Sequence, residues 1–91
     1  ILLSEIKKNK AGFVKLVSNF DWIEEIIEGE ANFLLLRVAD ATDLVEWCAQ
    51  NGIQIRDFSN HPQLEGCVRV TVGSYDEMSK LSETLTAYGE K

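Results

Sequence analysis

The sequence has little of what marks membrane, disulfide-rich or metal-binding proteins. Its 91 residues include two cysteines, one histidine and one proline. Because Cys48 and Cys67 lack both a metal-like spacing and a disulfide framework, we expect two buried, reduced thiols and no metal site. No apolar run approaches the roughly 20 residues that cross a bilayer, and nothing resembles a signal peptide. We therefore expect a cytoplasmic protein without a membrane partner.

Positive charge is also scarce. Nine Lys and Arg stand against fifteen Asp and Glu, which gives a formal net charge of -6 and a pI near 4.6. Such a balance repels a phosphate backbone, so nucleic acid is not an expected partner.

The only methionine, Met78, lies far from the first residue. We therefore expect the chain to be a piece of a longer protein.

Hydrophobic spacing and capping signals predict seven secondary-structure elements. The expected helices cover residues 2–18, 41–51 and 75–88, and the expected strands cover 22–28, 32–38, 53–57 and 67–72. Asp40 is placed to cap the second helix, and Ser74 with Glu77 has the form of a capping box for the third. This order predicts one α+β domain over residues 1–91, a small sheet of about four strands with helices packed on it.

Two further expectations concern the strands. Residues 32–38 form a nearly continuous apolar run, which predicts a central strand covered on both faces. Gly29 and Glu30, between the first two strands, are expected to form a kink or a bulge.

Arg56 and Arg69 are the most informative residues, because each stands inside an apolar strand. Side chains alternate along a strand, so Arg56 shares a face with Gln54 and Arg69 shares a face with Thr71, opposite the aliphatic residues. A guanidinium is costly in apolar surroundings unless it meets an anion. Two of them on neighbouring strands would suit a carboxylate or a phosphate. Together they predict a shared anion pocket.

An alternative stays open for this pair, and the other candidates are weaker. Arg56 and Arg69 could instead be surface residues paired with Asp57, Glu65 or another carboxylate. His61 stands alone in a loop without an acid or cysteine at a ligand-like spacing. No set of residues has the pattern of a catalytic centre, so we assign no catalytic residue.

Three segments of the chain resemble a known family. They are Glu30 to Val38 (EANFLLLRV), Gly52 to Asp57 (GIQIRD) and His61 to Gly73 (HPQLEGCVRVTVG). In order and spacing they are similar to the C-terminal small domain of histidinol-phosphate aminotransferase, a fold-type I enzyme that depends on pyridoxal phosphate. The likeness covers roughly residues 20 to 88, and residues 1 to 19 add no motif to it.

This resemblance implies an enzyme that is usually homodimeric and that exchanges the amino group of glutamate with imidazole acetol phosphate in histidine biosynthesis. It implies that Arg69 binds the α-carboxylate of the amino-acid substrate and that Arg56 helps to hold the phosphate of histidinol phosphate. Asn32 matches a family asparagine that is structural or near the site.

The resemblance also implies that the Schiff-base lysine and the cofactor cradle lie in a large domain. This chain alone is therefore expected to bind no pyridoxal phosphate and to catalyse nothing. Two alternatives remain: the small domain of a related enzyme such as threonine-phosphate decarboxylase, and a free-standing α+β module that binds a small anion.

Overall fold

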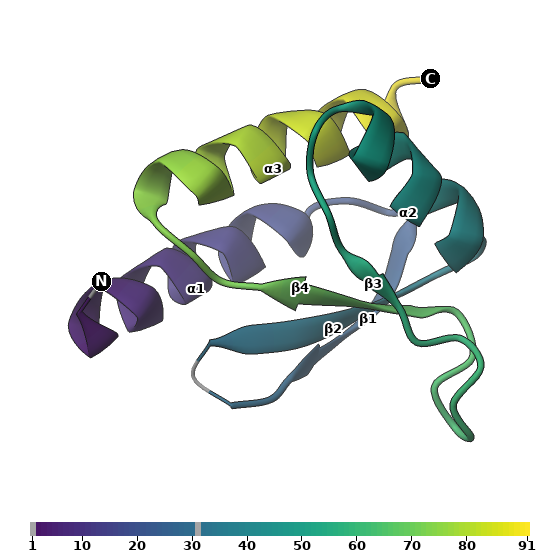
Figure 1. The fold of residues 1–91 in the computed structure, drawn as a ribbon, viewed down its shortest axis with the longest axis horizontal. Helices are drawn as coiled ribbons and strands as arrows, with labels where there is room; N and C mark the ends of the chain where they lie inside the picture. The colour runs from purple at the N-terminus through teal and green to yellow at the C-terminus, as the bar shows by residue number, and fades with distance from the viewer. Residues whose placement is uncertain (1, 31) are drawn as a thin grey trace.

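The computed structural model describes residues 2–30 and 32–91, where three helices lie along one face of a four-stranded sheet (Figure 1). The elements in chain order are α1 (Leu3–Val17), β1 (Ile23–Glu28), β2 (Phe33–Val38), α2 (Ala41–Gln50), β3 (Arg56–Asp57), β4 (Cys67–Thr71) and α3 (Tyr75–Gly89). The predicted order of elements and the predicted α+β class are therefore confirmed.

The sheet has the order β1-β2-β4-β3, and all neighbouring strands are antiparallel. β1 and β2 form a hairpin, and β4 lies between β2 and β3. Leu34 pairs with Val70 and Leu36 pairs with Val68, so four aliphatic side chains share one face of the two central strands. All four are at most 1% exposed.

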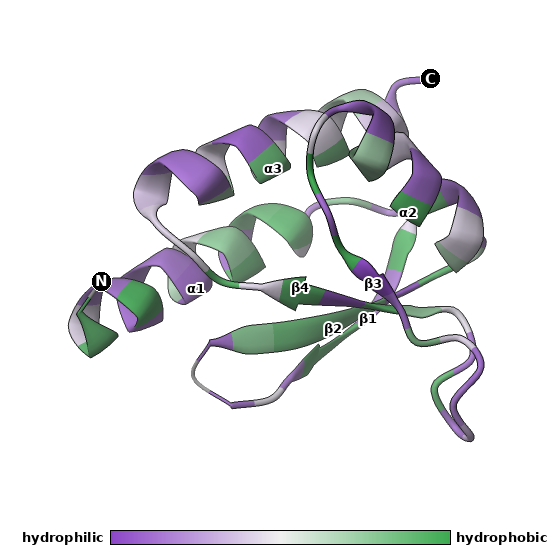
Figure 2. Ribbon diagram, viewed as in Figure 1, coloured by the Kyte–Doolittle hydropathy of each residue, from purple (hydrophilic) through white to green (hydrophobic). Residues whose placement is uncertain are grey.

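This aliphatic face forms the core against the three helices. Phe13 and Val17 of α1, Leu44 of α2, and Leu81 and Leu85 of α3 are buried in the same cluster. Figure 2 shows a largely hydrophobic colour along β2 and mixed colours along α3, as expected for a central strand and an amphipathic helix. The apolar face of α3 therefore packs into the core.

The expectation that β2 is covered on both faces is wrong for the described residues. Leu34 and Leu36 are fully buried, whereas Phe33 and Leu35, which point to the other face, are partly exposed. The reason is that the helices pack on a single side of the sheet (Figure 1). The opposite side of β2 and β4 is therefore uncovered and forms the open face of the sheet.

Two local expectations also need correction. The strand expected at 53–57 pairs with β4 only at Arg56 and Asp57, because the amide of Ile53 is bound to the carbonyl of Cys48 at the end of α2. That bond holds the chain away from β4. The residues of the expected kink, Gly29 and Glu30, lie in the loop between β1 and β2, while the shift in strand register falls between Ile23 and Glu25.

The predicted caps and thiols are confirmed. The side chain of Asp40 accepts a hydrogen bond from the amide of Asp43, and both bonds of the capping box between Ser74 and Glu77 are present. Cys48 and Cys67 are buried and free. None of the helices in the described ranges combines the length and apolar character needed to cross a bilayer.

The two faces of β2 predict different responses to the same substitution. Leu36→Ala should lower the free energy of unfolding by about 2 to 5 kcal/mol, because it opens a cavity in the core. Leu35→Ala, on the open face, should cost only about 1 kcal/mol. Urea unfolding measures both, and an equal loss in the two variants would contradict the one-sided core.

Candidate anion site

Arg56 and Arg69, the arginine pair, lie directly opposite each other in the sheet. β3 pairs with β4 in antiparallel register, and the Cα atoms of Arg56 and Arg69 are partners. Directly opposed residues project their side chains from the same face. The open face carries this pair, since the neighbouring residues Val68 and Val70 point into the core. The prediction that the two arginines stand on neighbouring strands is confirmed.

A shallow cavity of about 290 Å³ lies over the pair. Its lining residues are Gln54, Ile55, Arg56, Arg69 and Thr71. Gln54 lies two residues before Arg56, and Thr71 lies two residues after Arg69. The amide and the hydroxyl therefore extend the two guanidinium groups into one polar surface that is rich in hydrogen-bond donors.

Neither guanidinium of the pair has an ionic partner within residues 2–30 and 32–91. The carboxylate of Asp57 instead accepts hydrogen bonds from Ser59 and from the hydroxyl of Thr42. The bonds from Ser59 hold the pKa of Asp57 below its ordinary value. The internal ion pairs offered above as the alternative are therefore not seen in this part of the chain.

Two like charges that face each other across a pair of strands repel. Water weakens this repulsion, but each guanidinium still has free donors that point away from the core. An anion bound between them would replace the repulsion with two charge-assisted contacts, and the planar donors of arginine suit carboxylate and phosphate oxygens. The geometry of the open face therefore favours a single anionic ligand.

Aromatic rings further distinguish Arg69 from Arg56. The Cζ atom of Arg69 lies 5.1 Å from the ring centre of Phe33 and 5.9 Å from that of Phe58. Both distances are within the range of cation–π contacts. Sequence analysis missed these two rings, because Phe33 meets Arg69 only through the register of β2 and β4, which alternation alone does not reveal.

Arg37 of β2 differs from the arginine pair, because its guanidinium is bound to other groups of the chain. Its Nε lies 2.9 Å from the carboxylate of Glu25, and its other nitrogens donate to the carbonyls of Glu65 and Gln63. The hydrogen bond to Glu25 raises the pKa of Arg37. Arg37 therefore ties β1 to the loop 58–66 and has few donors left for a ligand.

The remaining candidates contribute no chemistry that the structure supports. His61 stacks on Phe58 with ring centres 4.7 Å apart. Asn32 is exposed, and its carbonyl accepts the amide of Val72, which is a structural role. The described residues contain no group of three or more His, Cys, Asp or Glu side chains that could hold a metal ion.

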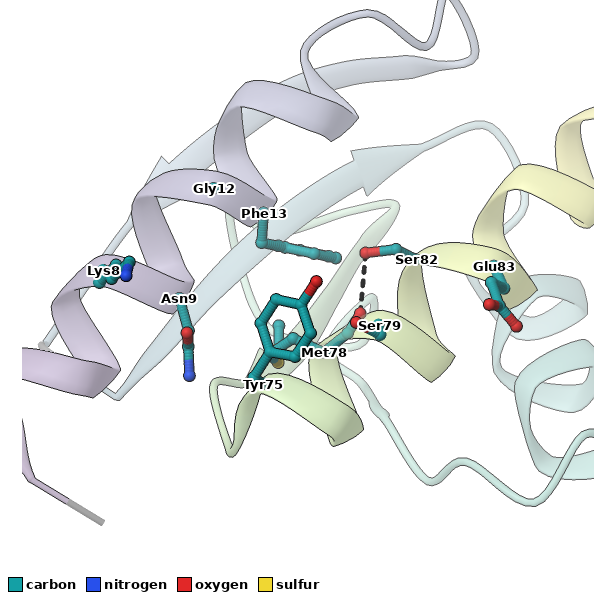
Figure 3. Close-up of a pocket in the computed structure, with 9 residues that line it drawn as sticks. All are labelled: Lys8, Asn9, Gly12, Phe13, Tyr75, Met78, Ser79, Ser82 and Glu83. Atoms are coloured by element: carbon teal, nitrogen blue, oxygen red, sulfur yellow. Dashed lines mark hydrogen bonds between the residues drawn. The ribbon is translucent and has the colours of Figure 1, made fainter.

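A second cavity, of about 460 Å³, lies between α1 and α3 on the helical side of the sheet (Figure 3). Its side chains include the apolar Phe13 and Met78, with Tyr75 across the opening and Lys8 and Glu83 at the margins. It lacks the paired cations of the open face. We therefore place the candidate site at the arginine pair.

The role of Arg37 yields a direct prediction. Arg37→Gln should speed amide hydrogen exchange at Leu64 and Cys67, whose hydrogen bonds close the turns of the loop 58–66. Lys15→Gln removes the same charge from an exposed position at the end of α1 and should leave these amides unchanged. If Arg37→Gln leaves the exchange rates in the loop unchanged, Arg37 does not hold this loop in place.

Comparison with known proteins gives a consistent result. No protein-family model matches the chain. The chain is 36% identical to histidinol-phosphate aminotransferase from Flavobacterium psychrophilum and 30% identical to that from Buchnera aphidicola, each over 86 residues. Those 86 residues are 94% of this chain, and the match spans 24% of each relative.

Solved structures share the fold. The structure of histidinol-phosphate aminotransferase from Clostridium acetobutylicum superposes with a TM-score of 0.86 at 22% identity, over 96% of this chain and 27% of that one. The L-threonine-O-3-phosphate decarboxylase of Porphyromonas gingivalis gives 0.86 at 24% identity, over 100% of this chain and 29% of that one. The predicted resemblance is thus confirmed, and the chain corresponds to one segment, about a quarter of the length, of histidinol-phosphate aminotransferases.

Proposed function

We propose that this chain is the substrate-binding small domain of a histidinol-phosphate aminotransferase. In the complete enzyme, a cytoplasmic homodimer, it would help to transfer an amino group between glutamate and imidazole acetol phosphate. The observation that carries the proposal is the arginine pair, two opposed cations on the open face without an ionic partner in the described chain. The similarity to enzymes of this name supports it.

The two arginines take different parts of the substrate. Arg69 binds the α-carboxylate of the amino-acid substrate, glutamate. Arg56, which is more exposed, helps to hold the phosphate of histidinol phosphate. Planar donor groups accept both shapes. Their work is to orient the substrate, and they break no bond.

The cofactor belongs to another part of the enzyme. Pyridoxal phosphate acts as an electron sink when bound, and it requires a lysine that carries it and an acid at its ring nitrogen. The cavity over the arginine pair has neither a lysine nor an acid among its described lining residues. The residues present here therefore do not fit the cofactor, and this chain supplies substrate binding alone.

Two other functions have some support. The fold match to a threonine-phosphate decarboxylase favours a related enzyme whose single substrate carries both a carboxylate and a phosphate. A free-standing anion-binding module is the second, because the arginine pair is complete within this chain. Titration of the chain with glutamate and histidinol phosphate separates these cases: binding at millimolar concentration or below favours the module, and no binding favours a half-site.

The enzyme that contains this chain and a cofactor-binding domain offers the main test. Arg69→Ala should lower kcat/KM for glutamate severely, and Arg56→Ala should lower kcat/KM more for the phosphorylated substrate than for glutamate. Loss of a bidentate charge pair costs about 2 to 5 kcal/mol in kcat/KM. Lys15→Ala, on the exposed side of α1, is the control and should change neither reaction. Unchanged kinetics in both arginine variants would contradict the assigned roles.

The separation of cofactor from substrate binding is testable on the chain itself. Purified chain mixed with pyridoxal phosphate should show only the absorbance spectrum of the free cofactor. A specific visible band that survives Lys80→Ala and disappears on mutation of another single lysine would show that the chain carries the cofactor, and it would overturn this part of the proposal.

A further inference from the structure

The two members of the arginine pair differ in how firmly they are held. Arg69 is partly buried and contacts the rings of Phe33 and Phe58, whereas Arg56 is exposed and has no aromatic contact among the described residues. A guanidinium that lies on a ring face keeps its in-plane N–H groups available for a ligand. The two ring contacts therefore restrict the motion of Arg69 without consuming its donors.

The rings reach Arg69 from opposite directions along β4. Phe33 of β2 is the partner of Thr71, two residues after Arg69. The amide of Phe58 donates to the carbonyl of Cys67, two residues before Arg69. Arg69 is thus flanked along its strand by one ring on each side, and both rings belong to neighbouring segments of the sheet.

Each ring has its own support. A Cβ atom at Gly29 would lie 2.7 Å from Cε2 of Phe33, so the ring occupies space that only a glycine leaves free. The buried ammonium of Lys10 donates to the carbonyls of Gly29 and Glu30 at 3.3 and 2.9 Å, which fixes this loop against α1. Phe58 opens the loop that Arg37 ties to β2.

We propose that Phe33 and Phe58 form an aromatic cradle that positions the guanidinium of Arg69 before the substrate arrives. The inference deepens the function proposed above and depends on it. Arg69 then presents fixed donors to the α-carboxylate of glutamate, while the free side chain of Arg56 adapts to the larger phosphate of histidinol phosphate. Restricting a side chain in advance lowers the entropy cost of binding. Phe33 and Phe58 are positioning residues, since they touch Arg69 and not the reacting atoms.

The cradle is tested first without any substrate, by NMR of the labelled chain. Ring currents should shift the side-chain protons of Arg69 upfield of those of Arg56. Phe33→Leu and Phe58→Leu should each remove part of that shift, and the Tyr variants should retain it. Gly29→Ala should reduce the part due to Phe33 by displacing its ring. The proposal would be overturned if the side-chain protons of Arg69 had the same chemical shifts as those of Arg56, or if neither Leu variant changed them.

Kinetics of the enzyme that carries the chain then test the consequence. Each Leu variant should raise KM for glutamate about 2- to 30-fold, the range expected for loss of one cation–π contact. The rise in KM for histidinol phosphate should be smaller, because Arg56 helps to hold its phosphate. The Tyr variants should restore wild-type KM. Phe20→Leu, whose ring stacks on Trp22, is the control for the loss of an aromatic side chain and should not change KM.

The outcomes separate this inference from the function on which it depends. If Arg69→Ala leaves turnover unchanged, the proposed function fails, even where the NMR shifts show that the cradle exists. If Arg69→Ala abolishes turnover of glutamate but both Leu variants keep wild-type KM, the function stands and the positioning role is wrong. Circular dichroism and urea unfolding of each variant establish that the comparison is made between folded proteins.

Discussion

The register between β3 and β4 is the constraint on which the rest of this structure depends. It sets Arg56 opposite Arg69, an arrangement of like charges that a sheet normally avoids. A one-residue slip would turn one arginine toward the core and would also expose Ile55 or a buried valine. The core and the arginine pair are therefore fixed by the same register, and neither can move without the other.

Because the helices pack on one side of the sheet only, the arginine pair on the other side stays accessible to a ligand. Helices α1, α2 and α3 cover the aliphatic face, so hydrophobic burial there supplies the stability while the open face remains free for polar side chains. The open face is itself organised. Arg37 is bound to Glu25 and to the loop 58–66, and Arg69 is held between two rings, whereas Arg56 keeps its freedom.

The features that could be predicted from the sequence are those that depend on residues close together in the chain. The capping box at Ser74, the cap at Asp40 and the period of two in 68–72 depend on neighbours in the chain, and they hold in the structure. The shared face of Arg56 and Arg69 follows from the same alternation, once the two strands are taken as neighbours.

The predictions that failed concern features that depend on contacts between segments far apart in the chain. The apolar run of β2 predicts burial on both faces, but its sequence carries no information on how many helices cover each side. The expected strand at 53–57 is shortened by the bond from Ile53 to the end of α2. The contact of Phe33 with Arg69 requires the register of β2 and β4. Motif resemblance pointed to the two arginines and was silent on the rings around them.

The most direct measurement of the central claim is a double-mutant cycle on the stability of the chain. If Arg56 and Arg69 oppose each other without internal partners, Arg56→Gln and Arg69→Gln should not weaken the fold through lost ion pairs. Their coupling free energy in urea unfolding should be repulsive at low salt and should shrink as salt is added. A coupling near zero at all salt concentrations, with a loss of stability in Arg56→Gln typical of a broken ion pair, would contradict the account.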